Sequence, residues 1–597
     1  MKHLCKQSGG VCLPKTGSPL FFAISLALFC PDTSATTRST VPDAGTFGNQ
    51  LRQESARTPI SPVGVPLVVP SGKEVQSRLT TDNHTTVVVR KVFFTGMPVG
   101  QGPSEHQLQQ LLTGMLNRPL TFHELMTMTR EITNRYRSEG FLVARAILPP
   151  QTIKDGELTI NIIPGRYDRV QLNNSSPLRD GLALQLIRTT TPEGGVLTRA
   201  QVEREAILLG DIPGVNTRVV MKSGSKPGTT TPDITLTSGK RFGGYVGMDN
   251  QGDRTTGRSR GMAGFYVNGL LGTGDLLQVN LLDAYENSGL INGSLDYSTL
   301  ASGYGTRVGL SYSHLNYHYS LSGFAFDGYS DNWGMYVSQP WIRTPRSRVD
   351  IRLDAGQQYL TDKYPQILVQ PSGRKGRKQV NAGTLSLTGS VADLTGGVSG
   401  FVVSGTVGNV DLRSELSRDW AAAAGNDGQF VRFNYRLNHD QRVWGPLSLF
   451  VNLNGQMSDH NLDTSQKFLM GGPTAVRAYD IGDGAVDEGV VGTVEIRSRW
   501  DISALGWMGA VPQLTVAAFY DQGYGQQYRH NASSVMAGDR LANDNNLNLA
   551  GAGLYTTVAD AGDYALTLTW ARRTGNADPN AVHDDRNRFW VSAVKTF

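Results

Sequence analysis

Short segments of alternating side chains most restrict what this chain can fold into. In residues 277–281 and 564–570, apolar or aromatic residues take every second position, with small or polar residues between them. A period of two puts one set on each face of a β-strand. No run of about 18 apolar residues follows the N-terminal segment, which excludes transmembrane helices. The pattern fits strands that face lipid on one side and a polar lumen on the other, with a soluble β-sandwich as the alternative.

Glycine content and the end of the chain favour the barrel. Of the 69 glycines, 47 lie in residues 240–597, where small residues suit turns and a lumen. Allowing about 22 residues for each strand and its connection divides this part into about sixteen strands. The chain ends on an aromatic residue, Phe597, after an alternating segment that Lys595 interrupts. We therefore expect a membrane β-barrel of about sixteen antiparallel strands over residues 239–597.

Residues 1–35 have the features of a secretory signal peptide. Lysines precede an apolar core, residues 20–29, and small residues follow it up to Ala35. All three cysteines lie in this segment, so cleavage near Ala35 leaves a chain without thiols. A lipoprotein signal ending at Cys30 is the alternative, although Phe29 is bulky for that processing site. We expect an exported protein without disulfides.

The next segment, residues 36–85, is polar and mixed in composition. Residues 43–58 could form one weak helix, and four prolines between residues 59 and 70 would then give a stiff, extended spacer. A disordered remnant of export is an equally open interpretation.

Residues 86–164 predict a compact α+β unit with the order β-α-α-β-β. Ser104 and Thr121 each begin a capping box, in which a hydroxyl and an amide or carboxylate satisfy free N–H groups of a helix. The second box opens an amphipathic helix, with Gly140 placed just after its end. The expected strands cover residues 87–94, 141–148 and 157–163.

Residues 165–238 repeat this order more weakly. Thr198 begins a third capping box at the start of a helix over residues 198–209. The other expected elements are a helix over residues 178–187 and strands over residues 167–172, 215–221 and 233–237. Two tandem modules of about 75 residues therefore precede the barrel.

Two sequence motifs in the expected barrel, residues 239–597, are distinctive enough to be compared with those of a known family. Residues 471–479 read GGPTAVRAY, and residues 519–523 read FYDQG. They are similar to the VRGY loop motif and the FxDxG strand motif of the outer-membrane translocators of two-partner secretion, the filamentous haemagglutinin and haemolysin transporter family. The family's glycine after the arginine is Ala478 here, which leaves the arginine intact. These motifs occur together with a signal peptide, two modules and a barrel. The chain therefore resembles this family over essentially its whole mature length.

The resemblance implies two periplasmic POTRA domains, residues 86–164 and 165–238, and a loop that folds back into the barrel lumen. Arg477 would pair with Asp521 on the inner wall, and residues 43–58 would be a plug helix in the resting pore. An exposed pair of this kind contributes only about 0–1 kcal/mol, so we expect it to position and gate the loop. The implied site residues are Val476, Arg477, Ala478 and Tyr479 in the loop, with Phe519, Asp521 and Gly523 on the wall.

The resemblance also implies a function. An unfolded exoprotein with an N-terminal secretion domain would add to POTRA strand edges in the periplasm and pass through the pore without ATP. The other implied partners are outer-membrane lipid, lipopolysaccharide and, during biogenesis, the barrel-assembly machinery of a Gram-negative bacterium. An outer-membrane factor that assembles and inserts other barrels, built on the same superfamily plan, is the alternative. The presence of only two modules, preceded by a plug-like helix and a proline-rich linker, favours the secretion function over the assembly function.

Other functional classes lack support in the sequence. A net charge of +5, from 56 basic and 51 acidic residues, does not indicate nucleic acid. There is no GxxxxGK[ST] or HExxH motif, and His314 and His318 have no evident third ligand. We therefore expect no catalytic residue, no cofactor and no metal. The glycines of residues 269–274 predict a hairpin turn, and the polar stretches at residues 364–378 and 411–429 predict loops, the first including a basic run at residues 374–378.

Overall fold

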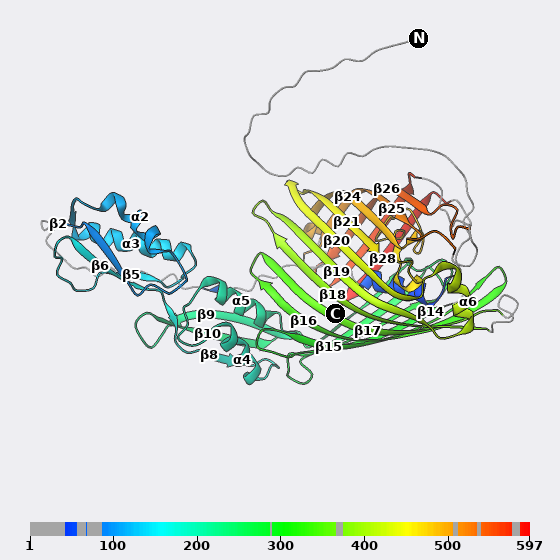
Figure 1. The fold of residues 1–597 in the computed structure, drawn as a ribbon, viewed down its shortest axis with the longest axis horizontal. Coiled ribbons are helices and arrows are strands. Elements are labelled where there is room, and N and C mark those ends of the chain that lie inside the picture. The colour runs from blue at the N-terminus through cyan, green and yellow to red at the C-terminus, as the bar shows by residue number, and fades with distance from the viewer. Residues whose placement is uncertain are drawn as a thin grey trace, which may run out of the picture. The chain divides into compact units, whose positions relative to one another are not determined.

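The computed structural model contains two α+β units, a closed barrel and a short helix that precedes them in the chain (Figure 1). It describes residues 42–55, 67–68, 86–286, 289–365, 374–505, 511–533, 539–575 and 585–597. The signal-peptide assignment to residues 1–35 and most of the expected linker lie outside the described residues. None of the helices described is both long and apolar enough to cross a membrane.

The first α+β unit packs helices α2 and α3 against a small sheet of order β3-β6-β5. Ser104 and Thr121 make both reciprocal bonds of the predicted capping boxes, and Gly140 follows α3 with a φ of +96°. The bounds are β2 (Thr86–Val88), β3 (Lys91–Thr95), α2 (Glu105–Leu112), η1 (Thr113–Met115), β4 (Pro119–Thr121), α3 (Phe122–Ser138), β5 (Arg145–Ile147) and β6 (Glu157–Ile163).

The expected single strand over residues 87–94 is two strands, β2 and β3. The backbone N–H groups of Arg90 and Lys91 both donate to the carbonyl of Gly156, at 2.8 and 3.2 Å. This contact turns the chain between the strands, so β2 pairs with β4 while β3 pairs with β6. A long-range contact of this kind leaves no mark on local strand propensity.

The second α+β unit has helices α4 and α5 over a sheet of order β1-β9-β10-β7, with β8 also on β10. Thr198 makes the predicted capping box at the start of α5. β1, a two-residue strand from the segment before the first unit, pairs in parallel with β9. The bounds are β1 (Leu67–Val68), β7 (Arg166–Tyr167), β8 (Gln171–Asn174), α4 (Asp180–Thr190), α5 (Arg199–Gly210), β9 (Val215–Ser223) and β10 (Thr229–Ser238).

Sixteen antiparallel strands close into a barrel, which confirms the predicted fold class (Figure 1). β11 closes the ring by pairing with β28, the last strand. The strands are β11 (Phe242–Asp249), β12 (Arg260–Asn268), β13 (Leu276–Ala284), β14 (Leu290–Leu300), β15 (Arg307–Leu321), β16 (Phe324–Arg343), β17 (Ser347–Lys363), β18 (Lys375–Ala392), β19 (Gly397–Leu412), β20 (Gly428–Trp444), β21 (Leu447–Ser458), β24 (Glu488–Asp501), β25 (Gln513–Gln526), β26 (Asn546–Asp560), β27 (Tyr564–Arg573) and β28 (Asn587–Thr596).

The predicted alternation corresponds to the two faces of the barrel wall. On β27, Leu566, Leu568 and Trp570 are exposed, as apolar side chains on the lipid side of a membrane barrel must be. Similar exposed apolar residues occur on most of the other strands. The wall therefore presents an apolar outer surface, while small and polar side chains line the lumen.

Two segments predicted as loops are partly regular structure. β18 begins at Lys375 and pairs with β17 from Lys363 onward, and helix α6 (Glu415–Ala424) lies within residues 411–429. Ser414 caps α6, and Gly425 ends it with a φ of +57°. Strands that extend beyond the hydrocarbon region face water on both sides, so they need no apolar alternation. The polar composition of these segments therefore concealed their structure.

The second α+β unit contacts three turns of the barrel. The backbone N–H of Arg179 donates to the carbonyl of Gly272, and a Cβ at Gly303 would lie 2.8 Å from the carbonyl oxygen of Gln185. The carboxylate of Asp211 accepts from Arg343 at 2.8 Å and from Arg348 at 3.1 Å. These contacts at three separate turns fix the unit against the barrel rim.

A buried carboxyl lies in the core of the second unit. Glu205, on α5, is 1% exposed, and its Oε2 lies 2.5 Å from the hydroxyl of Thr191. Its other oxygen, Oε1, has no hydrogen-bond partner. Burial raises the pKa of Glu205 to about 7, because the charged form loses its hydration.

We predict that the stability of this unit falls with rising pH. The raised pKa means that the folded state holds a proton that the unfolded chain releases, so stability is highest below pH 4.5 and falls by about 3 kcal/mol up to pH 7. Glu205→Gln keeps an oxygen that accepts from the hydroxyl of Thr191, and it removes this loss of stability. Hydrogen exchange of α5 amides, corrected for intrinsic rates, measures it between pH 5 and pH 8. Glu203→Gln, on the same helix, should retain the wild-type profile, and a pH-dependent Glu205→Gln variant would contradict the assignment.

Candidate functional site

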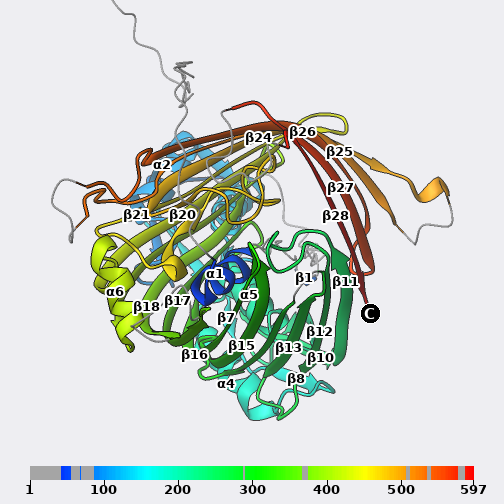
Figure 2. The same cartoon turned by 90° about the vertical axis from the view of Figure 1, so that its right-hand side faces the viewer.

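Two segments of the chain lie inside the ring of strands. One is α1 (Ala44–Ser55), which contacts β15, β16 and β17 (Figure 2). The other is the connection from β21 to β24, residues 459–487, with η3 (Thr464–Gln466), β22 (Phe468–Leu469) and β23 (Ala485–Val486). α1 also contacts η3, so the two segments touch each other. The predicted loop residues and wall residues meet where this connection reaches β25.

Arg477 and Asp521 form a fork of hydrogen bonds. Nε and Nη2 of Arg477 donate to the two carboxylate oxygens of Asp521, each at 2.8 Å. The backbone N–H of Arg477 donates to the same carboxylate at 3.1 Å, and the hydroxyl of Thr493 donates to it at 2.9 Å. A bidentate pair with these additional donors fixes both the position and the direction of the guanidinium.

The pair of Arg477 and Asp521 is buried, whereas the sequence led us to expect an exposed pair. The side chain of Arg477 is 10% exposed and that of Asp521 is fully buried. Nη1 of Arg477 also contacts Glu495 at 2.8 Å, and the guanidinium stacks 3.4 Å from the ring centroid of Phe519. Loss of one partner would leave a buried charge uncompensated, which costs about 3–5 kcal/mol. The pair therefore contributes much more to loop placement than the expected exposed pair.

The remaining motif residues form a close-packed contact between the loop and the wall. Val476 and Tyr479 are buried, and a Cβ at Gly523 would lie 3.1 Å from Cγ2 of Val476. Ala478 replaces the family's glycine, and its methyl group faces Gly551 on β26, where an added Cβ would lie only 2.5 Å away. Glycine at position 551 thus provides the space for the extra methyl group of Ala478.

A second cluster of charges holds the other end of the motif. Asp480 lies beside Arg258, Arg588 and, at 3.9 Å, Arg254. Nη2 of Arg258 donates to both oxygens of Asp480, at 3.0 and 2.9 Å. Arg588 lies on β28 and Arg258 just before β12, on the two sides of β11 at the closure of the barrel. None of these residues belongs to the site expected from the sequence.

The start of α1 is anchored by Lys378, which belongs to the basic run of residues 374–378. This run was expected to be a loop exposed to solvent. Nζ of Lys378, on β18, lies 2.8 Å from Asp43 and 2.8 Å from Asp463. Asp43 also caps α1, because its Oδ1 accepts from the backbone N–H of Thr46 at 2.8 Å. The expectation of a solvated basic run is therefore wrong for Lys378, which joins α1, the wall and the loop.

Further contacts hold the rest of α1 within the lumen. Glu54 contacts Arg260 on β12 at 2.9 Å, and Gln50 donates to Asp253 at 2.8 Å. Phe47 packs against the rings of Tyr317 and Tyr319, with centroids 4.8 and 6.0 Å away. These contacts are made by side chains, and the backbone N–H of Ala44 also donates to Asp362 on β17 at 2.8 Å. α1 therefore has no strand-like backbone pairing to the wall.

Some of the site residues that were not expected from the sequence have a weak signal in it. Glu495 and Arg497 alternate with the exposed apolar residues Val494 and Ile496 along β24. A charge at every second position of a membrane strand indicates a lumen-facing side chain. No comparable signal marks Lys378, because other basic residues surround it in the sequence.

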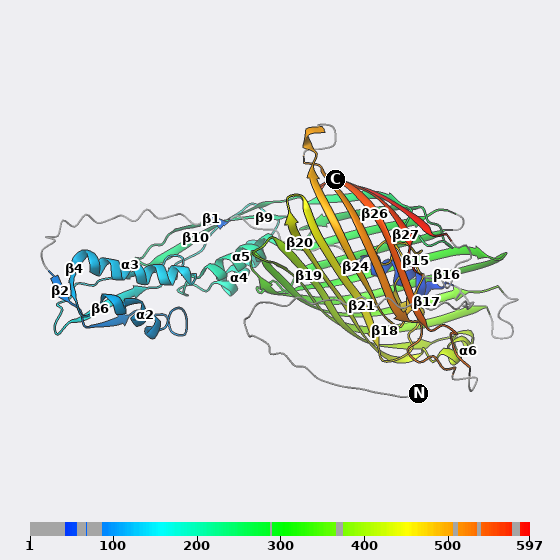
Figure 3. The ribbon, with the colours of Figure 1, turned by 90° about the horizontal axis from the view of Figure 1, so that it is seen from above.

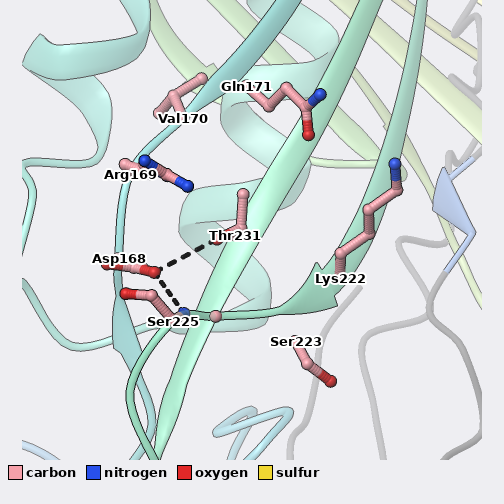
Figure 4. Close-up of a pocket in the computed structure, with 9 residues that line it drawn as sticks. Asp168, Arg169, Val170, Gln171, Lys222, Ser223, Ser225 and Thr231 are labelled. Carbon is pink, nitrogen blue, oxygen red and sulfur yellow. Dashed lines mark hydrogen bonds between the residues drawn. The ribbon is translucent and has the colours of Figure 1, made fainter.

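Other candidate groups lie away from the lumen. A polar cavity of about 460 Å³ in the second α+β unit is lined by residues of β8, β9 and β10, including Lys222 and Thr231 (Figure 4). There the backbone N–H of Ser225 donates to Asp168 and holds the pKa of that carboxyl below its usual value. His314 and His318 are exposed on β15, and each contacts one aspartate, at 2.8 and 2.7 Å.

We predict that Gly551→Ala displaces the lumen loop and that Ala478→Gly restores it. Two methyl carbons at 2.5 Å cannot coexist, and overpacking of this kind costs about 1–3 kcal/mol. A Val476→Cys reporter, buried in the parent, should react faster with a small maleimide in Gly551→Ala and return to the slow rate in the double variant. Equal labelling rates in all three proteins would contradict this packing.

Comparisons with known proteins agree with this architecture. The POTRA domain, ShlB-type, matches residues 87–165, and the family described as Haemolysin secretion/activation protein ShlB/FhaC/HecB matches residues 228–542. The Heme/hemopexin transporter protein HuxB of Haemophilus influenzae (strain 86-028NP) is 31% identical over 567 residues, which cover 93% of this chain and 95% of that protein. The Outer membrane transporter CdiB of Dickeya dadantii (strain 3937) is 22% identical over 439 residues, 71% of this chain and 74% of that protein.

The fold agrees with a solved relative. CdiB from Escherichia coli superposes with a TM-score of 0.69 at 17% identity, covering 94% of this chain and 100% of that one. The barrel lies in the outer membrane and the POTRA domains lie in the periplasm. The chain belongs to the haemolysin secretion/activation protein ShlB/FhaC/HecB family and is an outer-membrane transporter of two-partner secretion.

Proposed function

We propose that this transporter takes an unfolded exoprotein with an N-terminal secretion domain from the periplasm and passes it through a lumen that α1 and the loop of residues 459–487 fill at rest. The observation that supports this most is how these two segments are held. α1 has no strand-like pairing with the wall, which it contacts through side chains and the backbone N–H of Ala44, and the loop is fixed by Arg477 and Asp480. Contacts of this kind can break and re-form without opening the barrel wall.

The composition of α1 supports its role as a removable plug. It has twelve residues and includes Gly45 and Gly48, each of which lowers helix stability by about 1 kcal/mol relative to alanine. A helix of this length is marginal in water. A Cβ at Gly45 would lie 2.6 Å from the hydroxyl oxygen of Thr464, so the glycine permits close packing on η3. The lumen therefore supplies most of the stability of α1.

The loop differs from α1 because it remains joined to the wall at both ends. β21 precedes it and β24 follows it, and these two strands pair with each other. The buried fork of Arg477 and Asp521 then gives the loop one preferred position. We assign Val476, Arg477, Ala478 and Tyr479, with Phe519, Asp521 and Gly523, to the positioning and gating of this loop.

The first POTRA domain, residues 86–164, has features suited to an extended client. Both outer strands of its main sheet, β3 and β5, pair with a described strand on one side only. Side chains of the helices occupy part of the free edges, because Thr133 accepts from the N–H of Ala146 and Gln109 donates to the carbonyl of Val92. Leu111, Phe122 and Met126, on α2 and α3, expose apolar side chains. An open edge beside apolar surface recognises extended chains through the backbone, with little dependence on sequence.

The name of one relative suggests which class of client to test first, and the surface of the barrel suggests other partners. The Haemophilus influenzae relative is named a heme/hemopexin transporter protein, so an exoprotein of the haem or hemopexin class is the first client to test. The exposed apolar belt of the barrel supports contact with outer-membrane lipid. Arg374, Lys375 and Arg377, near the start of β18, offer charge for lipopolysaccharide. We propose the barrel-assembly machinery as the partner during biogenesis.

We predict that Arg477→Ala strongly reduces release of the exoprotein while the barrel remains folded and inserted. The variant leaves Asp521 buried without its cation, whereas Glu495 keeps Arg497 at 2.7 Å, so the loop loses its preferred position. Arg477→Lys keeps the charge without the fork and should be intermediate, whereas Arg442→Ala, at an exposed arginine, should secrete normally. Secreted exoprotein and heat-modifiable migration of the barrel measure the two properties. Normal secretion by Arg477→Ala would exclude the gating role.

We predict that deletion of residues 86–164 abolishes export and leaves insertion of the barrel intact. The barrel closes without contributions from this domain, and the deletion removes the open edges proposed to take up the client. Immunoblots of culture medium and of outer-membrane fractions measure the two outcomes. Secretion by the truncated protein would show that capture occurs elsewhere.

A further inference from the structure

Three basic side chains point outward from the barrel wall where β17 ends and β18 begins. Lys363 is the last residue of β17, and Lys375 and Arg377 lie at the start of β18. Their neighbours Asp362 and Lys378 contact the start of α1 inside the lumen. Successive side chains of a strand point to opposite faces, so Lys363, Lys375 and Arg377 lie on the outer face. All three are exposed, and we call them the outer cations.

The outer cations lie close to one another and to a fourth basic residue. Lys363 is directly opposite Lys375 in the pairing of β17 with β18, which places their Cβ atoms about 5 Å apart. Arg377 is two residues along β18 from Lys375, a distance of about 7 Å. Arg413 continues the ladder, because its backbone N–H donates to the carbonyl of Arg377. Like charges directly opposite each other destabilise a sheet, so this group favours an anion on the outer surface.

The carboxylates nearby compensate only part of this charge. Asp411 pairs with Arg413 at 2.7 Å. Asp327 lies opposite Lys363 across β16 and β17, but its carboxylate lies 2.7 Å from Nδ1 of His318. Within the part of the chain that the structure describes, none of the outer cations forms an ion pair. The patch therefore keeps an excess of positive charge.

The outer cations lie on the cell-surface side of the membrane belt. The opposite end of β17 contacts the periplasmic second POTRA domain, where Arg348 meets Asp211, whereas α6 contacts the wall at the far end (Figure 3). Along the outer face of β17, Lys363 is followed toward the periplasm by the exposed Tyr359 and then by the exposed Leu353. The order of charged, aromatic and apolar side chains marks the boundary between headgroups and hydrocarbon. The outer cations therefore lie at the level of the headgroups of the outer leaflet.

We propose that Lys363, Lys375, Arg377 and Arg413 form a binding site for phosphate groups of lipopolysaccharide. This inference deepens the lipopolysaccharide contact of the proposed function and rests on it. Ammonium and guanidinium groups together match the oxygen atoms of phosphate, and basic residues beside a membrane attract anionic lipid. A client in the pore meets the other face of these strands, where Lys378 lies. The outward direction of the four cations thus favours lipid over client.

Removal of the charges tests the site. The test variant replaces the three outer cations: Lys363→Gln, Lys375→Gln and Arg377→Gln. The matched control removes three exposed cations elsewhere: Lys154→Gln, Arg188→Gln and Arg442→Gln. Full-length proteins in detergent are titrated with lipopolysaccharide that lacks O-antigen, and native mass spectrometry measures the amount bound. We expect the affinity to fall about tenfold or more in the test variant and to stay at the wild-type value in the control.

A second comparison separates the phosphate groups from the lipid chains, which also bind the apolar belt. Lipopolysaccharide stripped of phosphate with hydrofluoric acid should bind wild-type protein about tenfold more weakly than intact lipopolysaccharide. The test variant should bind both forms equally weakly, and excess inorganic phosphate should not displace the lipid from wild-type protein. Heat-modifiable migration reports whether each variant is folded. The comparison of the two lipids on wild-type protein remains decisive if the test variant does not fold.

The outcomes distinguish the site from the rest of the proposed function. Equal affinity of wild type and folded test variant for intact lipopolysaccharide would overturn the site and leave lipopolysaccharide as a partner. Equal binding of the two lipids by wild type would do the same, and displacement by inorganic phosphate would assign the cations to the free ion. Lost exoprotein release with unchanged lipid binding would assign them to the client and overturn the proposal. The lipid titrations use no exoprotein, so failure of the proposed export leaves them valid.

Discussion

The lumen of a sixteen-stranded barrel is the constraint on which the rest of this structure depends. Closing sixteen strands satisfies every backbone hydrogen bond within the membrane, but it leaves an interior that wall side chains cannot fill. The chain fills this space with two of its own segments, α1 and residues 459–487. Both segments meet the wall through charged side chains as well as through apolar and aromatic contacts, because the lumen face of the wall carries both kinds of side chain.

Each lumen segment is held by a cation between two carboxylates, and the two cations suit different tasks. Arg477 lies between Asp521 and Glu495 with its planar fork stacked on Phe519, which favours one orientation. Lys378 lies between Asp43 and Asp463 as a compact charge that water can readily solvate. The arginine contact suits a loop that keeps its place on the wall, and the lysine contact suits the departure from the lumen that we propose for α1.

Sequence patterns revealed those features whose cause is local. The capping box at Thr121 and the alternation of residues 564–570 were predictable because a few neighbouring residues determine them. The loop and wall motifs identified Arg477 and Asp521 through their resemblance to a family. Lys378 and Asp43 are 335 positions apart, and only the register of β18 and the position of α1 bring them together. No local pattern contains that information.

The connectivity between the lumen and the periplasm limits how the parts can act. Eleven residues, 56–66, join α1 to β1 and span at most about 40 Å when fully extended, so α1 and β1 cannot change place independently over long distances. The second α+β unit is fixed to the rim through Asp211 and the turn at Gly272. While β1 stays on β9, the departure that we propose for α1 is therefore limited to about this distance, and it requires no change in the barrel wall.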